Sequence, residues 1–330
     1  RDWSSDVCSS DLGRNEYEYD AYRLISESTA AMRAQNLVSI HYLYDGLNRL
    51  VKIDYPKTAD TEYEYGEPGT PDNAAGKVTL LTDASGTTEY KYGKLGEVTE
   101  ETRTIHRRRQ SSTEIDTAST GYVSNYLGQI EQLTYPDGET VTYGYDAGGN
   151  VKFLKGSHYG HTFLYVTDIG YNEQGQRAFI EYGTGVRTFY EYDENRRWLS
   201  SIETSKDGSQ YQNISYEFDS VGNVLGYTND CTSYGNYSTS QSYSYDALYQ
   251  LTHAEGSTSY TPYKGVKPVH TSRYTQDFSF DVLGNMTEKV STNRIEPSQL
   301  KLGDDLNYSF AYSYAEGFAH RLDHVGNRYY

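Results

Sequence analysis

Residues Tyr216-Glu-Phe-Asp-Ser-Val-Gly-Asn-Val224 and Tyr143-Gly-Tyr-Asp-Ala-Gly-Gly-Asn-Val151 carry the pattern that decides the fold of this chain. In both stretches, two aromatic residues lie on either side of one other residue, and Asp follows directly. Gly comes three positions after the Asp, and Asn and Val follow the Gly. Side chains alternate between the faces of a strand, so both rings lie on one face. The Asp carboxylate can accept backbone N–H groups of a turn, and Gly readily adopts a positive φ. The pattern predicts a strand, a tight turn and a return strand.

The aromatic pair recurs along the whole chain, which is the signature of a repeat architecture. Its ten copies are Tyr17-Glu-Tyr19-Asp20, Tyr42-Leu-Tyr44-Asp45, Tyr63-Glu-Tyr65-Gly66, Tyr90-Lys-Tyr92-Gly93, Tyr143-Gly-Tyr145-Asp146, Tyr190-Glu-Tyr192-Asp193, Tyr216-Glu-Phe218-Asp219, Tyr243-Ser-Tyr245-Asp246, Phe278-Ser-Phe280-Asp281 and Tyr312-Ser-Tyr314-Ala315. The Gly that follows is Gly149, Gly222 or Gly284 in three copies, and Gly93-Lys-Leu-Gly96 and Asn172-Glu-Gln-Gly175 keep the same spacing. We expect these residues to serve the fold.

Some copies lack the Gly of the turn. The residue at that position is Asn48 in one copy, Arg196 in another and Tyr249 in a third. Asn tolerates a positive φ, whereas Arg and Tyr adopt it at a cost in free energy. We therefore predict that the turns with Arg196 and Tyr249 have a different geometry.

A second class of turn alternates with the first. Pro136-Asp-Gly138 and Lys206-Asp-Gly208 are reverse-turn signals, so one unit has two strands and two turns. The motif Asp residues recur at steps of 25 to 27 residues at Asp20 to Asp45, Asp193 to Asp219 and Asp219 to Asp246. The predicted fold is all-β: a repeat-built antiparallel sheet of short strands and hairpins. For Ile25 to Val38 we expect a strand and loop, with a short helix as the alternative.

Composition excludes several classes of function. The formal net charge of −17 disfavours nucleic-acid binding, because an acidic chain repels phosphates. The basic cluster Arg107-Arg-Arg109 lies in a polar stretch near residues 103–120, where we expect a solvated loop. No run of about 18 apolar residues occurs, so the sequence predicts no membrane span. Hydrophobic residues make up only 36%, but the 37 tyrosines can build a core with their large rings.

The first twelve residues resemble a translated sequencing adapter, and we leave them out of the fold. We expect the chain to be truncated at both ends, with residues 13–330 forming one repeat region. Without Cys8, Cys231 stands alone, which excludes a disulfide framework and a thiolate zinc site.

Candidate chemistry is weak throughout. A three-residue step in His158-Tyr-Gly-His161 points the rings to opposite faces of a strand, and His320 and His324 would lie roughly 13 Å apart along one, so we expect no metal site. The repeated Asp residues are explained by their turns, with calcium binding as an alternative. Cys231 has no base in sequence reach, and Trp198 is expected to pack in the sheet rather than stack on a sugar. We predict no catalytic, cofactor-binding or metal residues.

The pattern aromatic-x-aromatic-Asp-x-x-Gly-Asn/Arg-apolar resembles the YD repeat of the Rhs (rearrangement hotspot) proteins, bacterial wall-associated proteins and the C component of insecticidal toxin complexes. Tyr143 to Val151 and Tyr216 to Val224 match best, and Tyr42 to Leu50 matches in part, while the resemblance covers nearly all of residues 14–330. It implies a section of a long β-sheet that spirals into a hollow shell, which in toxin members encloses a C-terminal toxic domain. The Asp-Pro-rich self-cleavage region of that family has no counterpart here.

The resemblance implies a non-enzymatic segment of a large secreted or cell-surface bacterial protein, without a cofactor. Its expected partners are further repeats and a C-terminal cargo domain of the same polypeptide. The alternative is a surface adhesin that binds glycan or cell wall through exposed aromatics. Unpaired strands at both ends of such a segment predict self-association.

Overall fold

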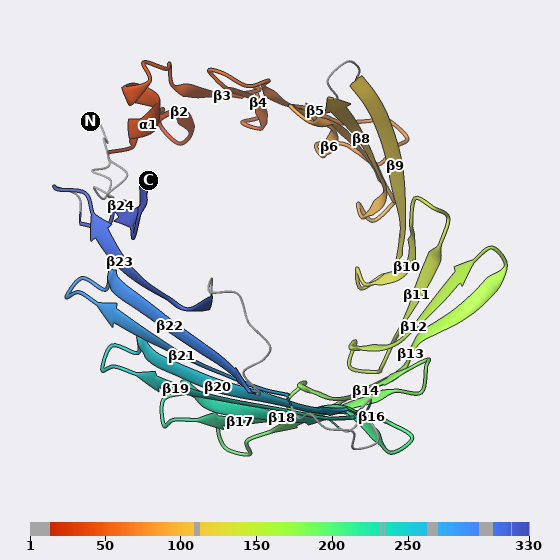
Figure 1. Cartoon of the computed structure of the whole chain (residues 1–330). Helices are drawn as coiled ribbons and strands as arrows, with labels where there is room; N and C mark the ends of the chain where they lie inside the picture. The colour runs from red at the N-terminus through yellow and green to blue at the C-terminus, as the bar shows by residue number, and fades with distance from the viewer. Residues whose placement is uncertain are drawn as a thin grey trace. The chain divides into compact units, whose positions relative to one another are not determined.

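The computed structural model describes residues 14–108, 113–231, 233, 235–262, 270–296, 306–317 and 319–329. In these residues the chain forms 25 β-strands and one short α-helix (Figure 1). It divides into two compact units, Arg1–Phe163 and Leu164–Tyr330. Residues 1–12 and Arg109 lie outside the described residues.

In the first unit, short strands follow one another along the chain. They are β1 (Glu16–Tyr19), β2 (Leu24–Ser28), β3 (Ile40–Tyr44), β4 (Leu50–Asp54), β5 (Thr61–Tyr65), β6 (Val78–Asp83), β7 (Gly86–Tyr92), β8 (Val98–Arg108), β9 (Thr113–Ser124), β10 (Ile130–Thr134), β11 (Thr140–Tyr145) and β12 (Val151–His158), with helix α1 (Ala30–Ala34) between β2 and β3.

The second unit continues the same plan, after β13 begins in the last residues of the first. Its strands are β13 (His161–Tyr171), β14 (Arg177–Tyr182), β15 (Arg187–Tyr192), β16 (Leu199–Lys206), β17 (Ser209–Phe218), β18 (Val224–Cys231), β19 (Gly235–Tyr245), β20 (Leu251–Pro262), β21 (His270–Phe280), β22 (Met286–Glu296), β23 (Tyr308–Tyr314), β24 (Leu322–Val325) and β25 (Arg328–Tyr329).

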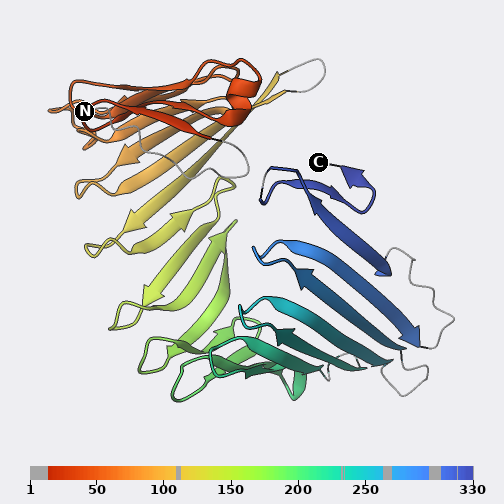
Figure 2. The ribbon, with the colours of Figure 1, turned by 90° about the vertical axis from the view of Figure 1, so that its left-hand side faces the viewer.

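Within each unit, every strand pairs antiparallel with the next strand of the chain, as the ribbons in Figure 2 show. In β11 and β12, Tyr143 faces Leu154, but a bulge makes Tyr145 face Val151. The same register shift falls on the second aromatic of every motif copy, where it brings the chain into its turn. The predicted all-β fold of hairpins is therefore confirmed.

The alternating strand directions place the two classes of turn at opposite edges of each unit. Motif turns, which begin with the repeated Asp or with Gly, Asn or Ala in its place, follow odd-numbered strands. Turns such as 135–138 and 207–208 follow even-numbered strands. We call the edge with the repeated Asp the Asp-turn edge. The alternation expected from the sequence is confirmed.

The core is one layer thick. Among the described residues only Ala74, Val141, Ile180 and Ala254 are buried apolar residues. Apolar burial therefore comes chiefly from neighbouring side chains on the same face of the sheet.

The motif aromatics make up much of that face. In β3 the exposure alternates, with Tyr42 and Tyr44 half-buried and Leu43 exposed. Other motif aromatics lie on β11 (Tyr143, Tyr145), β15 (Tyr190, Tyr192), β17 (Tyr216, Phe218), β19 (Tyr243, Tyr245) and β21 (Phe278, Phe280), and all of these are half-buried. The one-face arrangement predicted from their spacing is confirmed.

The solvated loop expected near residues 103–120 is wrong. Most of this stretch belongs to the long strands β8 and β9, which pair from Glu100 with Gly121 to Arg108 with Thr113. The hydroxyl groups of Thr104 and Thr117 hydrogen-bond across the pair at 3.1 Å. β-Branched side chains and cross-strand polar pairs stabilise these strands without an apolar pattern.

Between Ile25 and Val38 the structure combines both interpretations. Strand β2 ends at Ser28, as the expected strand and loop required, and the five-residue helix α1 follows. The hydroxyl group of Thr29 caps this helix by accepting the N–H of Met32 at 3.2 Å. In the part of the chain that the structure describes, no helix is long and apolar enough to span a membrane.

Candidate functional site

The repeated Asp closes its turn through both the backbone and the carboxylate. The N–H of Asp281 donates to the carbonyl of Asn285 (2.9 Å), and the N–H of Gly284 donates to the carbonyl of Asp281 (3.1 Å). The Oδ1 atom of Asp281 accepts the N–H groups of Leu283 (2.8 Å) and Asn285 (2.9 Å), and Oδ2 accepts the Asn285 side-chain amide (2.8 Å). The Asn285 side chain, with these backbone donors, holds the pKa of Asp281 below its ordinary value.

The same arrangement recurs along the Asp-turn edge. Oδ1 accepts the N–H groups two and four residues later at Asp45, Asp146, Asp219, Asp246, Asn125 and Asn172. Because the neutral amide of Asn closes two of these turns, a negative charge is not needed. N–H donors converge on each oxygen, which disfavours the calcium alternative, since a cation requires converging oxygens.

The two turns expected to be unusual behave differently from each other. The prediction is wrong for Tyr249, which has a φ of 62° and donates its N–H to the Asp carbonyl (3.1 Å) as Gly does elsewhere. It is confirmed for Arg196, because that turn is one residue longer and the positive φ of 62° falls on Arg197. Asn48 adopts a φ of 63°, as its tolerance for this region allows.

The second aromatic of the motif is tied to the preceding strand by its hydroxyl group. The phenol of Tyr245, at the end of β19, donates to the backbone carbonyl of Val224 (2.9 Å), the first residue of β18. Among the described residues, seven tyrosines make this contact, which we call the tyrosine latch. The oxygen–oxygen distances are 2.5 to 2.9 Å, for Tyr44 to Leu24, Tyr65 to Leu50, Tyr92 to Val78, Tyr145 to Ile130, Tyr192 to Arg177, Tyr245 to Val224 and Tyr314 to Met286.

The latch lies where the hydrogen-bond ladder stops. Between β18 and β19 the last ladder pair on this side joins Gly226 with Ser242, so the Val224 carbonyl lies beyond it. A carbonyl without a partner costs free energy, and the phenol supplies one. The sequence pattern predicted that the rings share one face, but it did not predict this bond. A signal was present, because most copies pair an apolar residue at the start of one strand with a Tyr at the end of the next strand.

A cation often completes the latch. The Arg49 guanidinium lies 4.3 Å from the Tyr65 ring centre, and its Nε donates to Asp45 Oδ2 at 2.6 Å. Arg23 holds Asp20 and the Tyr44 ring in the same way. The Arg of the repeat thus joins the Asp of its own turn to the Tyr of the next hairpin.

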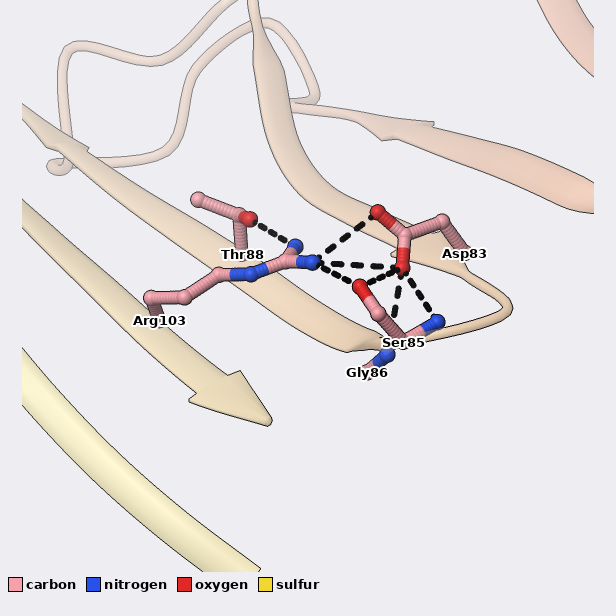
Figure 3. A network of polar contacts seen from close by, with 5 residues as sticks. All are labelled: Asp83, Ser85, Gly86, Thr88 and Arg103. Atoms are coloured by element: carbon pink, nitrogen blue, oxygen red, sulfur yellow. Dashed lines mark hydrogen bonds and ion pairs between the residues drawn. The ribbon is translucent and has the colours of Figure 1, made fainter. Parts of the chain in front are cut away.

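A different polar network fixes one turn at the opposite edge (Figure 3). Asp83 Oδ1 accepts the hydroxyl (2.6 Å) and N–H (2.7 Å) of Ser85 and the N–H of Gly86 (3.1 Å). From β8, Arg103 donates to Asp83 Oδ2 (3.0 Å) and to the Thr88 hydroxyl (2.6 Å). The Ser85 hydroxyl above all, and then the Ser85 N–H and Arg103, lower the pKa of Asp83 to about 2.

The remaining candidates have structural neighbours. The Cys231 thiol donates to the Tyr211 carbonyl (3.0 Å), and burial raises its pKa, which disfavours a reactive thiolate. Trp198 packs against Phe218, with ring centres 5.2 Å apart. His158 contacts the Asp137 carbonyl at 3.1 Å. Among the described residues, no three His, Cys, Asp or Glu side chains are placed to hold a metal ion.

Comparison with known proteins gives both sequence relatives and structural neighbours. The chain is 27% identical over 315 residues to the toxin subunit YenC1 of Yersinia entomophaga, covering 84% of this chain and 29% of YenC1. It is 29% identical over 157 residues to YenC2 of the same organism, covering 40% of this chain and 16% of YenC2. The chain thus spans less than a third of the length of these relatives. No family model matches it.

Among solved structures, a crystal structure of TcdB2-TccC3 matches 92% of this chain and 16% of its own, with a TM-score of 0.76 at 20% identity. A Tc holotoxin pore of Photorhabdus luminescens also matches 92% of this chain and 16% of its own, with a TM-score of 0.68 at 19% identity. The chain is therefore a homologue of the YenC toxin subunits with the fold found in TcdB2-TccC3, which confirms its resemblance to the YD-repeat (Rhs) proteins.

Proposed function

We propose that this chain is a non-enzymatic wall segment of a toxin-type YD-repeat protein, forming part of a shell around a C-terminal cargo domain. The single observation that carries the proposal is the tyrosine latch, which repeats through both units and joins seven of the hairpins to the strand before them. The side chains that could take part in catalysis instead form hydrogen bonds within the turns and at the ends of paired strands. Similarity to toxin subunits supports a role within a toxin.

The mechanism is confinement. A sheet one layer thick covers a large area with few residues, and latched hairpins resist local opening of that sheet. Partners in this mechanism are further repeats and the cargo of the same polypeptide, in a secreted toxin. No specific contact favours the adhesin alternative, because the motif aromatics other than Tyr19 are half-buried rather than presented as an exposed strip for a glycan.

Limited proteolysis of the longer polypeptide tests the proposal. We expect its C-terminal domain to resist protease in the wild type and to be digested faster when Tyr192, Tyr245 and Tyr314 are replaced by Phe. Tyr22→Phe is the control, because Tyr22 is 95% exposed and lies outside the latches. A C-terminal domain digested as fast within the wild-type polypeptide as after its release would overturn the shell.

A further inference from the structure

The strand pair β21 and β22 brings two positive charges together. Arg273 lies directly opposite Arg294, and like charges in such positions repel each other. A like-charged pair elsewhere in this unit, Asp168 with Glu181, is relieved by Arg187, whose guanidinium lies 2.7 Å from Glu181 Oε2. Arg273 has no such counterion, because its side chain makes no hydrogen bond or ion pair with any residue that the structure describes.

Arg273 also lines a groove of about 370 Å³ on one face of the sheet. Ser240 of β19 faces Ser257 of β20, and Ser257 faces Arg273 of β21. Ser242 and Thr275 lie two residues along their strands from Ser240 and Arg273, so their side chains share that face, and both line the groove. Three neighbouring strands therefore contribute polar side chains to one groove.

The serine hydroxyl groups of this groove are not used by the fold. Where two hydroxyl side chains face each other elsewhere in the unit, they can hydrogen-bond across the strands, as Thr188 does with Thr204 at 2.9 Å. Ser240 and Ser257 also face each other, yet neither hydroxyl group has a partner within the described part of the chain. The groove therefore combines free hydroxyl groups with a guanidinium that lacks a counterion.

We propose that this groove binds a divalent oxyanion of the phosphate or sulfate class between Arg273 and Arg294. Two negative charges on one ion would offset the repulsion between the two guanidinium groups. A guanidinium presents paired N–H donors that match two oxygens of one phosphate. The hydroxyl group of Ser257, which lies in the same row as the arginines, would donate to a further oxygen.

Charge restricts the ligand to a small ion. The net charge of −17 repels polyanions such as nucleic acid. Glu255 also lines the groove, in the row of Ser242 and Thr275, and its Oε2 lies 4.0 Å from His253 Nε2. Its negative charge confines the anion to the arginine row. Because the ion would hold neighbouring strands together, its binding stabilises the folded sheet, whatever the segment encloses.

Thermal unfolding of the 330-residue chain in inorganic phosphate, compared with chloride at equal ionic strength, tests the site. We expect phosphate at ten times its dissociation constant to raise the unfolding midpoint of the wild type by about 2 °C. Arg273→Gln should remove this shift, and in chloride it should unfold no earlier than the wild type, because the repulsion is relieved. The matched control is Arg328→Gln, which removes the same charge from an exposed position of the same unit and should keep the shift.

Isothermal titration calorimetry gives a second readout. The dissociation constant of phosphate should rise at least about tenfold in Arg273→Gln, with sulfate replacing phosphate in competition, and circular dichroism verifies the strand content of both variants. Equal phosphate shifts in the wild type and Arg273→Gln would overturn the site, as would loss of the shift in Arg328→Gln. Binding to phosphatidic acid vesicles that depends on Arg273, without binding of the free ion, would reject a small-ion site.

Discussion

At the scale of single residues, the second Tyr of the motif combines three interactions. Tyr65 packs its ring on the half-buried face, lies beneath the Arg49 guanidinium at 4.3 Å, and donates its hydroxyl to the Leu50 carbonyl at 2.8 Å. Phe can provide the first two but not the third. In the two copies that end in Phe, Phe218 and Phe280, the latch is absent for this reason.

Removal of one latch should therefore be measurable. We predict that Tyr245→Phe lowers the free energy of unfolding by about 1 kcal/mol, because the Val224 carbonyl loses its partner at the end of the ladder. Urea unfolding followed by circular dichroism measures the change. Tyr126→Phe is the control, since Tyr126 is 92% exposed, and it should have no effect. Equal stability of the two variants would show that water replaces the phenol without cost.

The Tyr at a positive φ gives a change of opposite sign. We predict that Tyr249→Gly stabilises the chain by about 0.5 kcal/mol, because Gly adopts the φ of 62° without strain, although it loses more entropy on folding. Thermal unfolding measures it, and Asn48→Gly should give a smaller gain, since Asn tolerates this region. A loss of stability in Tyr249→Gly would mean that its ring makes contacts that outweigh the strain.

The sequence was sufficient for the interactions that are local along the chain. The Asp turns, the positive φ of their Gly residues and the shared face of the rings all follow from spacing within about ten residues. The tyrosine latch joins Tyr245 to Val224 across the register of two strands, which local spacing does not define. The turn of Arg196 and that of Tyr249 look alike in sequence, and only the length of the turn separates them.

At the scale of elements, the turn between β6 and β7 depends on a charged network rather than on a latch. Asp83 has a folded pKa of about 2, below the unfolded value of about 3.9. Its contribution to stability is therefore fully present above about pH 4 and is lost as the pH falls through 2. Arg103 extends the network to a third strand, β8.

We predict that Ser85→Ala reduces this acid sensitivity. Without the hydroxyl, the pKa of Asp83 lies nearer its unfolded value, so the variant should lose about 1 kcal/mol less than the wild type between pH 4 and pH 2, a figure reduced for the partial exposure of the carboxylate. Urea unfolding at each pH measures the difference. Ser220→Ala, in an exposed turn, is the control and should follow the wild-type curve; a parallel curve for Ser85→Ala would contradict the prediction.

The ends of strands could be predicted from the sequence where the sheet has an aromatic face. They could not be predicted where that face lacks aromatic residues. β8 and β9 are rich in Thr and charge, and polar pairs such as Arg107 with Asp116 at 2.6 Å join them. Such pairs form only once the two strands are in register, so the stretch reads as a loop in sequence.

At the scale of the whole molecule, the strands that the structure describes within each unit pair with their neighbours in the chain, as in solenoid proteins. We predict that destabilisation stays local. Tyr245→Phe should speed amide hydrogen exchange in β18, β19 and β20 and leave β5, β6 and β7 unchanged, as measured by mass spectrometry of peptides. Uniformly faster exchange throughout the chain would instead show one cooperative unfolding unit.

The alternation of turn classes between the two edges also constrains how such a chain can change in length. Loss or duplication of a single strand would reverse the direction of every strand that follows it, and would move all later Asp turns and latches to the other edge. Loss or duplication of two strands leaves them in place. Viable insertions and deletions should therefore come in even numbers of strands. The length of the sheet would then change during evolution by whole hairpins.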